Sequence, residues 1–464
     1  MPPGTYDIKY DAKGFRPLER TGVTVTANTV VRGDAALEVG NVSEQVTVEA
    51  AAVQLQADKA DVHTELSARE IESMPMSNYR NYQSLIDLVP GSTPATFQNA
   101  NTDTPARALS TNINGTNRNN NSTRLDGAVN VFVWLPHHTV YVPPAETIAN
   151  VNIATDNFDA DQGMAGGAAI TVITKSGTNQ IHGSAFGYLE NSYFGAKNYF
   201  FTDPKKPKSI RTIPGFTLGG PFIKNRWFFF GGYEGLFERQ NRNSLFTVPT
   251  ADQRAGDFSA TGATIYDPST GNPDGTGRIP FANNKVPVID PIAMKVQDLL
   301  PLPNRPGFTN NFFNSASQKM DRKNVDFKTD INITDKFRLF ARYGYMQADV
   351  VGVFGLGAAG GPCLCDGGAA TGDTTVNIAT VGYTYTLSSN KIYDATYGFT
   401  RLGHISTGQD FGKNWGSDVF GIPGTNGPDP RESGLPFFQI SGYTNIGNDH
   451  SLIPSYRNDQ SFAT

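Results

Sequence analysis

The feature that most constrains this fold is a regular alternation of apolar and polar side chains in four segments of the second half of the chain. Each segment has roughly 7 to 10 residues and carries Val, Ile, Leu, Tyr or Phe on one face and charged or small polar residues on the other. Side chains of a β-strand point alternately to opposite faces, so this period predicts strands with one apolar side. The segments run from Val325 to Ile333, from Lys336 to Tyr345, from Thr380 to Leu387 and from Tyr393 to Phe399.

The length of these segments matches that of a tilted strand crossing a membrane, which needs about 9 to 11 residues. Their apolar faces are rich in Tyr and Phe, as at a membrane interface, while the polar faces suit a wet or plugged interior. A soluble β-sandwich also alternates, so the period alone leaves both architectures open. Further strands are expected at His182 to Asn191, Thr212 to Gly220 and Trp227 to Tyr233, and the polar stretch from Asn241 to Asn324 is expected to be a long loop.

Composition narrows the classes of function. Only 17% of residues are charged, the net charge is −5 and no basic block occurs, so we expect no nucleic-acid partner. No apolar run reaches the ~18 residues of a transmembrane helix. The two cysteines, Cys363 and Cys365, lie in a Gly-rich stretch and are interpreted as a loop pair, with a strained disulfide or metal chemistry left open.

The first part of the chain divides into two regions. Residues 1–45 show short alternating strands, at Tyr6 to Tyr10 and Val23 to Val25, which are too few to close a sandwich of about seven strands. We therefore predict the end of a larger Ig-like β-sandwich there. Residues 46–178 mix helix and strand. Ser67 and Glu70 have the spacing of a capping box, a second helix is predicted through Leu88 with Ser77 or Asn78 as its cap, and Ala169 to Thr174 reads as a strong strand.

Catalytic signatures are absent from the sequence. It contains no G-x-S-x-G, H-E-x-x-H or phosphate-binding loop motif. The adjacent pair His137-His138 is interpreted mainly as part of a loop, because neighbouring side chains diverge in extended chain and seldom reach one metal. We expect no enzyme, no cofactor and no metal site.

Residues 46 to 250 resemble TonB-dependent outer-membrane transporters of the subclass that begins with a carboxypeptidase-regulatory-like domain. The order and spacing of several segments carry this resemblance. They are Arg80-Asn81-Tyr82-Gln83-Ser84-Leu85, Arg124-Leu125-Asp126-Gly127, Pro143-Pro144-Ala145-Glu146-Thr147-Ile148, and Gly166 to Asn179 continuing through His182-Gly183-Ser184-Ala185-Phe186.

The resemblance implies a mainly β fold in three parts. Residues 1–45 would be the end of the regulatory-like, Ig-like domain, 46–178 an α+β plug domain, and 179–464 the first part of an antiparallel transmembrane β-barrel with long extracellular loops. It also implies a bacterial outer-membrane location, contact with outer-membrane lipid and the TonB energy-coupling complex as a partner. No signal peptide or coupling box is recognised and few barrel strands can be counted, so we expect a piece of a longer protein.

The implied activity is uptake of a substrate bound at the plug apex and the extracellular loops. An Asn-rich loop and a loop ending in His137-His138 suit a polar oligomer such as a glycan or a peptide, although another small molecule remains open. A surface adhesin or assembly protein without transport is the alternative. The candidate contact residues are Asn114, Asn117, Asn119, Asn130, Trp134, His137 and His138.

Overall fold

The computed structural model describes residues 4–25, 31, 33–39, 46–49, 62–76, 79–97, 101–102, 104–158, 162–163, 165–200, 206–360, 370–388, 390–448 and 455–463. Cys363 and Cys365 lie outside these residues, so the expectation for them stays as it was. Ser77 and Asn78 lie outside them as well.

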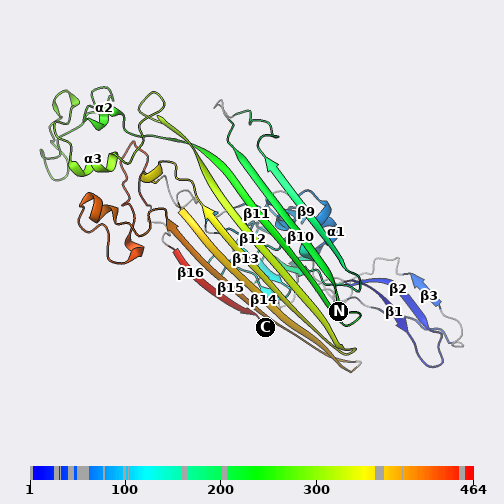
Figure 1. Ribbon diagram of the computed structural model, residues 1–464. Helices are drawn as coiled ribbons and strands as arrows, with labels where there is room; N and C mark the ends of the chain where they lie inside the picture. Colours follow the sequence, from blue (N-terminus) through cyan, green and yellow to red (C-terminus); the bar gives the residue numbers. More distant parts are fainter. Residues whose placement is uncertain are drawn as a thin grey trace.

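The second half of the chain forms one antiparallel sheet of eight strands, the outer sheet, in which every strand pairs with its neighbour in sequence (Figure 1). This order is a continuous meander, as in membrane barrels. The strands are β9 (His182–Asn191), β10 (Ser209–Ile223), β11 (Trp227–Phe246), β12 (Phe312–Thr334), β13 (Phe337–Val351), β14 (Ala370–Ser388), β15 (Lys391–Gly408) and β16 (Ser455–Ala463).

Several strands are longer than their sequence suggests. The stretch from Asn241 to Asn324 was predicted as loop, but β11 continues to Phe246 and β12 already begins at Phe312, so the loop covers only 247–311. The prediction failed at both ends because these residues lack the apolar face of a membrane strand. They nevertheless pair in register, from Gln240 with Gln318 to Phe246 with Phe312.

The two ends of the outer sheet differ. At one end, the turn end, two or three residues join successive strands, at 224–226, 335–336 and 389–390. At the other, the loop end, the connections are long and include the short helices α2 (Ala251–Arg254) and α3 (Pro291–Gln297) (Figure 1). Short turns on one side and long loops on the other are typical of outer-membrane barrels.

The loops at the loop end pack on each other. Apolar side chains from the loops that follow β11, β13 and β15 share one core, and Arg254 donates to the carbonyls of Gln297 and Leu300, both at 3.1 Å. Buried apolar area gives these polar loops a fixed shape. The buried members of this core are Phe246, Val248, Val296, Leu356, Ala359, Phe420, Leu435 and Ile446.

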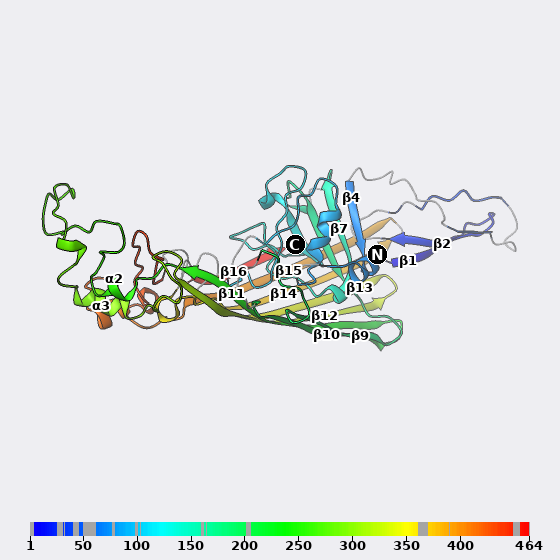
Figure 2. The same cartoon turned by 90° about the horizontal axis from the view of Figure 1, so that it is seen from above.

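Residues 62–174 form a separate inner domain that covers one face of the outer sheet (Figure 2). Its five-stranded sheet has the order β4-β7-β8-β5-β6, with β8 parallel to β5 and the other pairs antiparallel. The strands are β4 (Val62–Ser67), β5 (Ser122–Leu125), β6 (Ala128–Val129), β7 (Ile148–Asp156) and β8 (Ala169–Thr174).

Short helices complete the inner domain. Helix α1 (Ala68–Ser73) begins with the predicted capping box, in which the Glu70 backbone N–H donates to Ser67 Oγ and the Glu70 carboxylate accepts from the Ser67 N–H. The second predicted helix is a 3-10 helix, η1 (Tyr82–Leu88). Its cap is Asn81, whose side chain accepts from the Gln83 N–H, so the prediction of Ser77 or Asn78 as the cap was wrong because the helix begins later than expected. The remaining 3-10 turns are η2 (Arg118–Asn120) and η3 (Ala145–Thr147).

The inner domain and the outer sheet share a single hydrophobic core. Met346, Val376, Ile378 and Leu402 of the outer sheet are buried in the same cluster as Tyr141, Ile148 and Val172 of the inner domain, among others. The two parts therefore pack as one unit. Among the described residues, no helix is long and apolar enough to cross a membrane.

The N-terminal segment forms a three-stranded sheet at the turn end, with β1 (Gly4–Tyr10), β2 (Leu18–Val25) and β3 (Val46–Glu49) (Figure 1). Strand β3 pairs in parallel with β2. The domain boundary expected at residue 45 thus falls inside this sheet.

The two faces of the outer sheet provide a test of its environment. Val381 of β14 points outward and pairs with Ala341 and Tyr397 at an apolar level of the sheet. Val381→Arg is expected to lower the free energy of unfolding by about 2–4 kcal/mol, the cost of arginine at the middle of a lipid-facing surface. Urea unfolding in lipid vesicles measures this value.

The matched control is Thr375→Arg, on the same face of β14 but beside Gln347, where the outward residues are polar. It is expected to cost about 0–1 kcal/mol. Equal costs at the two positions would mean that lipid does not cover the outward face at the level of Val381.

Candidate functional site between the inner domain and the outer sheet

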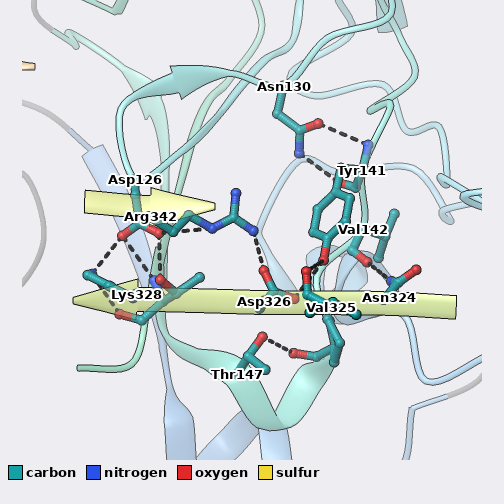
Figure 3. A network of polar contacts seen from close by, with 12 residues as sticks. Asp126, Asn130, Tyr141, Val142, Thr147, Asn324, Val325, Asp326, Lys328 and Arg342 are labelled. Atoms are coloured by element: carbon teal, nitrogen blue, oxygen red, sulfur yellow. Dashed lines mark hydrogen bonds and ion pairs between the residues drawn. The ribbon is translucent and has the colours of Figure 1, made fainter. Parts of the chain in front are cut away.

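Four alternate side chains of strand β12 point inward and bind the inner domain, and we call them the β12 clasp: Arg322, Asn324, Asp326 and Lys328. Figure 3 shows Asn324, Asp326 and Lys328. Alternate residues of a strand share a face, so the four line up toward the same neighbour. All four are buried. Arg322 Nη1 donates to the Ala106 carbonyl at 2.7 Å, and Asn324 Nδ2 donates to the Val142 carbonyl at 2.9 Å.

Asp326 holds a tyrosine of the inner domain. The Tyr141 hydroxyl donates to Asp326 Oδ2 at 2.6 Å, and Arg342 of β13 forms an ion pair with the other carboxylate oxygen (Figure 3). Complete burial, followed by the charge of Asp326, raises the pKa of Tyr141 well above its ordinary value of 10.0. Tyr141 therefore stays protonated and acts as a hydrogen-bond donor.

Asp126 of the inner domain is the main partner of Lys328 and also lies close to Arg342. Its carboxylate accepts from Lys328 Nζ at 2.9 Å and from the Thr174 hydroxyl at 2.6 Å, and Arg342 Nε lies 3.7 Å away. Asp126 has a positive φ of 46° and is followed by Gly127, so a tight turn aims this side chain at the outer sheet. Lys328 also donates to the Thr174 carbonyl at 3.0 Å.

A further polar group joins the inner domain to β9, β10 and β11. The Tyr79 hydroxyl donates to Glu238 at 3.1 Å, and Arg211 lies over the Tyr79 ring while binding Glu238 at 2.7 Å. Nearby, Arg80 pairs with Glu146 at 2.7 Å and stacks on the Tyr188 ring.

The inner domain meets β15 differently, through close backbone contact. A Cβ on Gly398 would lie 2.4 Å from the Cα of Ala128, so only glycine fits at this position. The Thr400 hydroxyl donates to the Val129 carbonyl at 2.7 Å. The interface thus combines buried charge at β12 and β13 with small residues at β15.

Chemically, this arrangement fixes a domain in place. Buried ion pairs add little net stability, but removing one partner is costly because the other charge stays buried. Such pairs therefore favour one position of the inner domain over any displaced one. Among the described residues, no group of three or more His, Cys, Asp and Glu is placed to hold a metal ion.

The seven candidate contact residues separate into two sets. Asn130 and His138 are 0% and 1% exposed, so neither is open to a ligand in this conformation. Asn130 instead ties two segments, because its Nδ2 donates to the Tyr141 carbonyl at 2.7 Å and its Oδ1 accepts from the Tyr141 N–H at 3.0 Å. Asn114, Asn117, Asn119 and Trp134 are exposed, and His137 is half-buried.

Part of the exposed set forms a cluster. His137 Nδ1 and Asn119 Oδ1 lie 2.7 Å apart, which joins the two predicted loops. Trp134 is 53% exposed, and the guanidinium of Arg457 from β16 lies 4.3 Å from its ring centroid. Asn117 caps η2, and Asn114 donates to the Thr155 carbonyl at 3.2 Å.

Both histidines are held in their neutral form. Burial, followed by the nearby charge of Arg118, lowers the pKa of His137 to about 4. Burial, then His137 and two arginines, lowers the pKa of His138 to about 3. The pair therefore carries no charge at neutral pH.

Only two of the four residues of the β12 clasp were predicted from the sequence to lie on a strand. Asp326 and Lys328 were recognised as the polar face of a strand, whereas Arg322 and Asn324 were placed in a loop. The signal that could have found them is the continuing two-residue spacing of polar residues from Arg322 to Lys328. Their partners on the inner domain, such as Ala106 and Val142, are backbone carbonyls without a sequence signature.

Comparison with known proteins agrees with this architecture. The model of the family described as outer membrane beta barrel domain matches residues 173–464. The chain belongs to this family, and its location is the bacterial outer membrane.

The chain is also similar to the TonB-dependent transporter Oar of Myxococcus xanthus, with 25% identity over 289 residues. The match covers 59% of this chain and 26% of that protein, so the chain spans about a quarter of the curated relative it matches. The relative is a transporter, in keeping with the expectation that this chain is no enzyme.

Solved structures of two outer-membrane proteins are similar as well. The outer membrane transporter YddB of Escherichia coli aligns with 9% identity and a TM-score of 0.48, over 86% of this chain and 44% of that one. The siderophore receptor PiuA of Acinetobacter baumannii aligns with 11% identity and a TM-score of 0.40, over 87% and 52%.

The clasp makes a stability prediction. Asp126→Ala leaves Lys328 buried without its carboxylate and is expected to cost about 3–5 kcal/mol. The double variant Asp126→Leu with Lys328→Met removes both charges and is expected to cost less than Asp126→Ala alone. Thermal unfolding in detergent micelles gives the comparison.

The control is Lys319→Met, on the outward face of β12, where Lys319 pairs with Asp321 at 3.1 Å near the surface. This pair is partly exposed, so its loss is expected to cost less than about 1 kcal/mol. A cost for Asp126→Ala no larger than the control would contradict a buried clasp.

The burial of His138 leads us to predict how the stability of the protein depends on pH. The pKa of His138 is lowered from 6.5 to about 3, so the unfolded chain binds a proton between these values and the folded chain does not. Stability must therefore fall as the pH drops from 6.5 toward 3. His138→Gln is expected to reduce this fall, whereas His182→Gln, at an exposed position, leaves it unchanged. Melting temperatures at pH 7, 5 and 4 provide the test, and identical slopes in both variants would refute it.

Proposed function

We propose that the protein containing this chain takes up a substrate across the outer membrane in a TonB-dependent manner. The main support for this proposal is that the inner domain covers the polar face of the outer sheet and is held there by the buried β12 clasp. A path along this face needs the inner domain to move, and moving it separates buried charges. External work is therefore required, which energy coupling through TonB would supply.

In this proposal the three parts have separate roles. Residues 179–464 form part of the barrel and residues 1–45 the end of a regulatory-like domain. Residues 46–178 form the plug, and their first strand, β3, pairs with β2 and so joins the plug to the N-terminal sheet. Strand β4 lies at the edge of the plug sheet, pairs with β7 and follows the N-terminal segment in the chain. A pull from the N-terminal side would therefore act first on β4.

The substrate we propose is a polar oligomer, a glycan or a peptide, bound at the plug apex. Asn117 Oδ1 accepts from the Asn119 N–H and Asn119 Oδ1 contacts His137 Nδ1, and each amide also carries an NH₂ group that can donate to a ligand. Trp134, in the same loop as His137, has a half-exposed indole. Amide donors and an aromatic ring suit hydroxyl or carbonyl acceptors on an amphipathic ligand.

An adhesive or surface-assembly role without transport is the second candidate. The observation in its favour is the shared core of the loops, which gives the loop end a fixed surface. Energy dependence separates the two roles, because adhesion needs no proton gradient.

The test uses cells that express the whole protein and a library of fluorescently labelled oligosaccharides and short peptides. Uptake that stops on adding a protonophore, while surface binding persists, is the expected result. Trp134→Ala is expected to weaken binding about tenfold, the loss of one aromatic stacking contact.

Trp227→Ala, at the turn end, is the matched control and is expected to leave ligand affinity unchanged. Equal ligand affinity of the Trp134→Ala and Trp227→Ala variants would contradict a binding site at the plug apex. Binding without any energy-dependent uptake would favour the adhesive role.

A further inference from the structure

The segment between β9 and β10 lies at the loop end of the outer sheet (Figure 1). It carries four exposed aromatic rings. Their exposed fractions lie between 76% and 93%. Single exposed apolar residues are ordinary, but two exposed aromatic pairs in one short segment indicate an interaction surface. The rings are those of Tyr193, Phe194, Tyr199 and Phe200.

This segment has a defined conformation. The Tyr193 N–H donates to Asn191 Oδ1 and the Phe200 N–H to Asn198 Oδ1, both at 2.9 Å. Lys206 Nζ donates to the Gly195 carbonyl at 2.5 Å. The side-chain amides thus fix both aromatic pairs, which are edge-to-face with centroids 5.5 and 5.3 Å apart.

The register places the rings just beyond the lipid-facing surface. Leu189 is the last apolar residue on the outward face of β9 and is exposed. It pairs with Thr212 of β10, which in turn pairs with Phe237 of β11, so these three residues lie at one level of the sheet. In the next row, Asn191 is level with Arg239 through Ile210. Charged groups therefore begin on the outward surface at the level where the aromatic segment starts.

The charge of the segment also fits a lipid headgroup. Residues 192–208 contain four lysines and one aspartate, and Lys208 is exposed. Basic residues near a membrane surface bind anionic headgroups, and amphipathic aromatic rings collect at the same level. In the outer leaflet of the outer membrane, that layer consists of phosphorylated sugars.

We propose that residues 192–200, together with Lys206 and Lys208, anchor the β9–β10 hairpin in the phosphorylated glycolipid headgroups of the outer leaflet. The rings stack on sugar faces and the exposed ammonium group of Lys208 binds phosphate, whereas Lys206, whose Nζ donates to the Ser192 and Gly195 carbonyls, holds the segment in shape. This anchor is independent of the proposed uptake and of its substrate.

The probe is purified lipopolysaccharide, and the sample is the whole protein in detergent. Replacing the four rings with serine is expected to lower the affinity for lipopolysaccharide about tenfold or more. The matched control carries Tyr266→Ser and Phe308→Ser, two exposed rings of the 247–311 loop. It is expected to bind like the parent protein, and equal affinity of all three proteins overturns the proposal.

A second measurement does not depend on the folding of the four-ring variant. Tyr199→Cys, in a background with Cys363→Ser and Cys365→Ser, carries an environment-sensitive dye. The protein is placed in phosphatidylethanolamine–phosphatidylglycerol vesicles with or without lipopolysaccharide. A blue shift that needs lipopolysaccharide supports the anchor. No shift means that the rings stay in water, and an equal shift in both vesicles means that protein or phospholipid covers them; either result overturns the proposal.

Discussion

The whole arrangement depends on how the inward charges of β12 and β13 are neutralised. Arg322, Asp326 and Lys328 alternate with outward side chains such as Val325 and Phe327, so one strand presents charge to one side and apolar surface to the other. Neither side is stable alone in water or in lipid, because buried charge needs a partner and apolar surface needs burial. The inner domain supplies the partners through Asp126, Tyr141 and backbone carbonyls, and the membrane covers the other face.

The same constraint explains the composition of the interface. Where β12 and β13 meet the inner domain, side chains carry the contact, and the ion pairs of Lys328 and Arg342 with Asp126 determine its position. Where β15 meets it, Gly398 and Ala128 bring the backbones close together. Charge thus sets the register of the two parts, and small residues set their distance.

Much of the fold could be predicted from local patterns. The capping box of Ser67 and Glu70, the strand at Ala169–Thr174 and the strands around Val325, Tyr343 and Tyr397 depend on nearby residues, and the structure has them. The extent of β12 could not be predicted, since its polar first half is stabilised by pairing with β11 and by the inner domain. The burial of Asn130 and His138 was missed because the loop from Asn130 to Tyr141 folds back on itself, with Asn130 bound to Tyr141 and the His138 carbonyl bound to the Phe132 N–H, and such contacts within a loop have no periodic signal in the sequence.

The uneven lengths of the strands shape the rim of the sheet. Strand β9 ends at Asn191, which is level with Arg239, but β11 continues for seven more residues to Phe246. At about 3.4 Å per residue, this is a step of about 24 Å along the strand. The rim formed by the strands is therefore stepped, low at β9 and high at β11 and β12. The segment that follows β9 thus leaves the sheet well below the level at which the loop between β11 and β12 begins, so the two connections start at different heights along the strands.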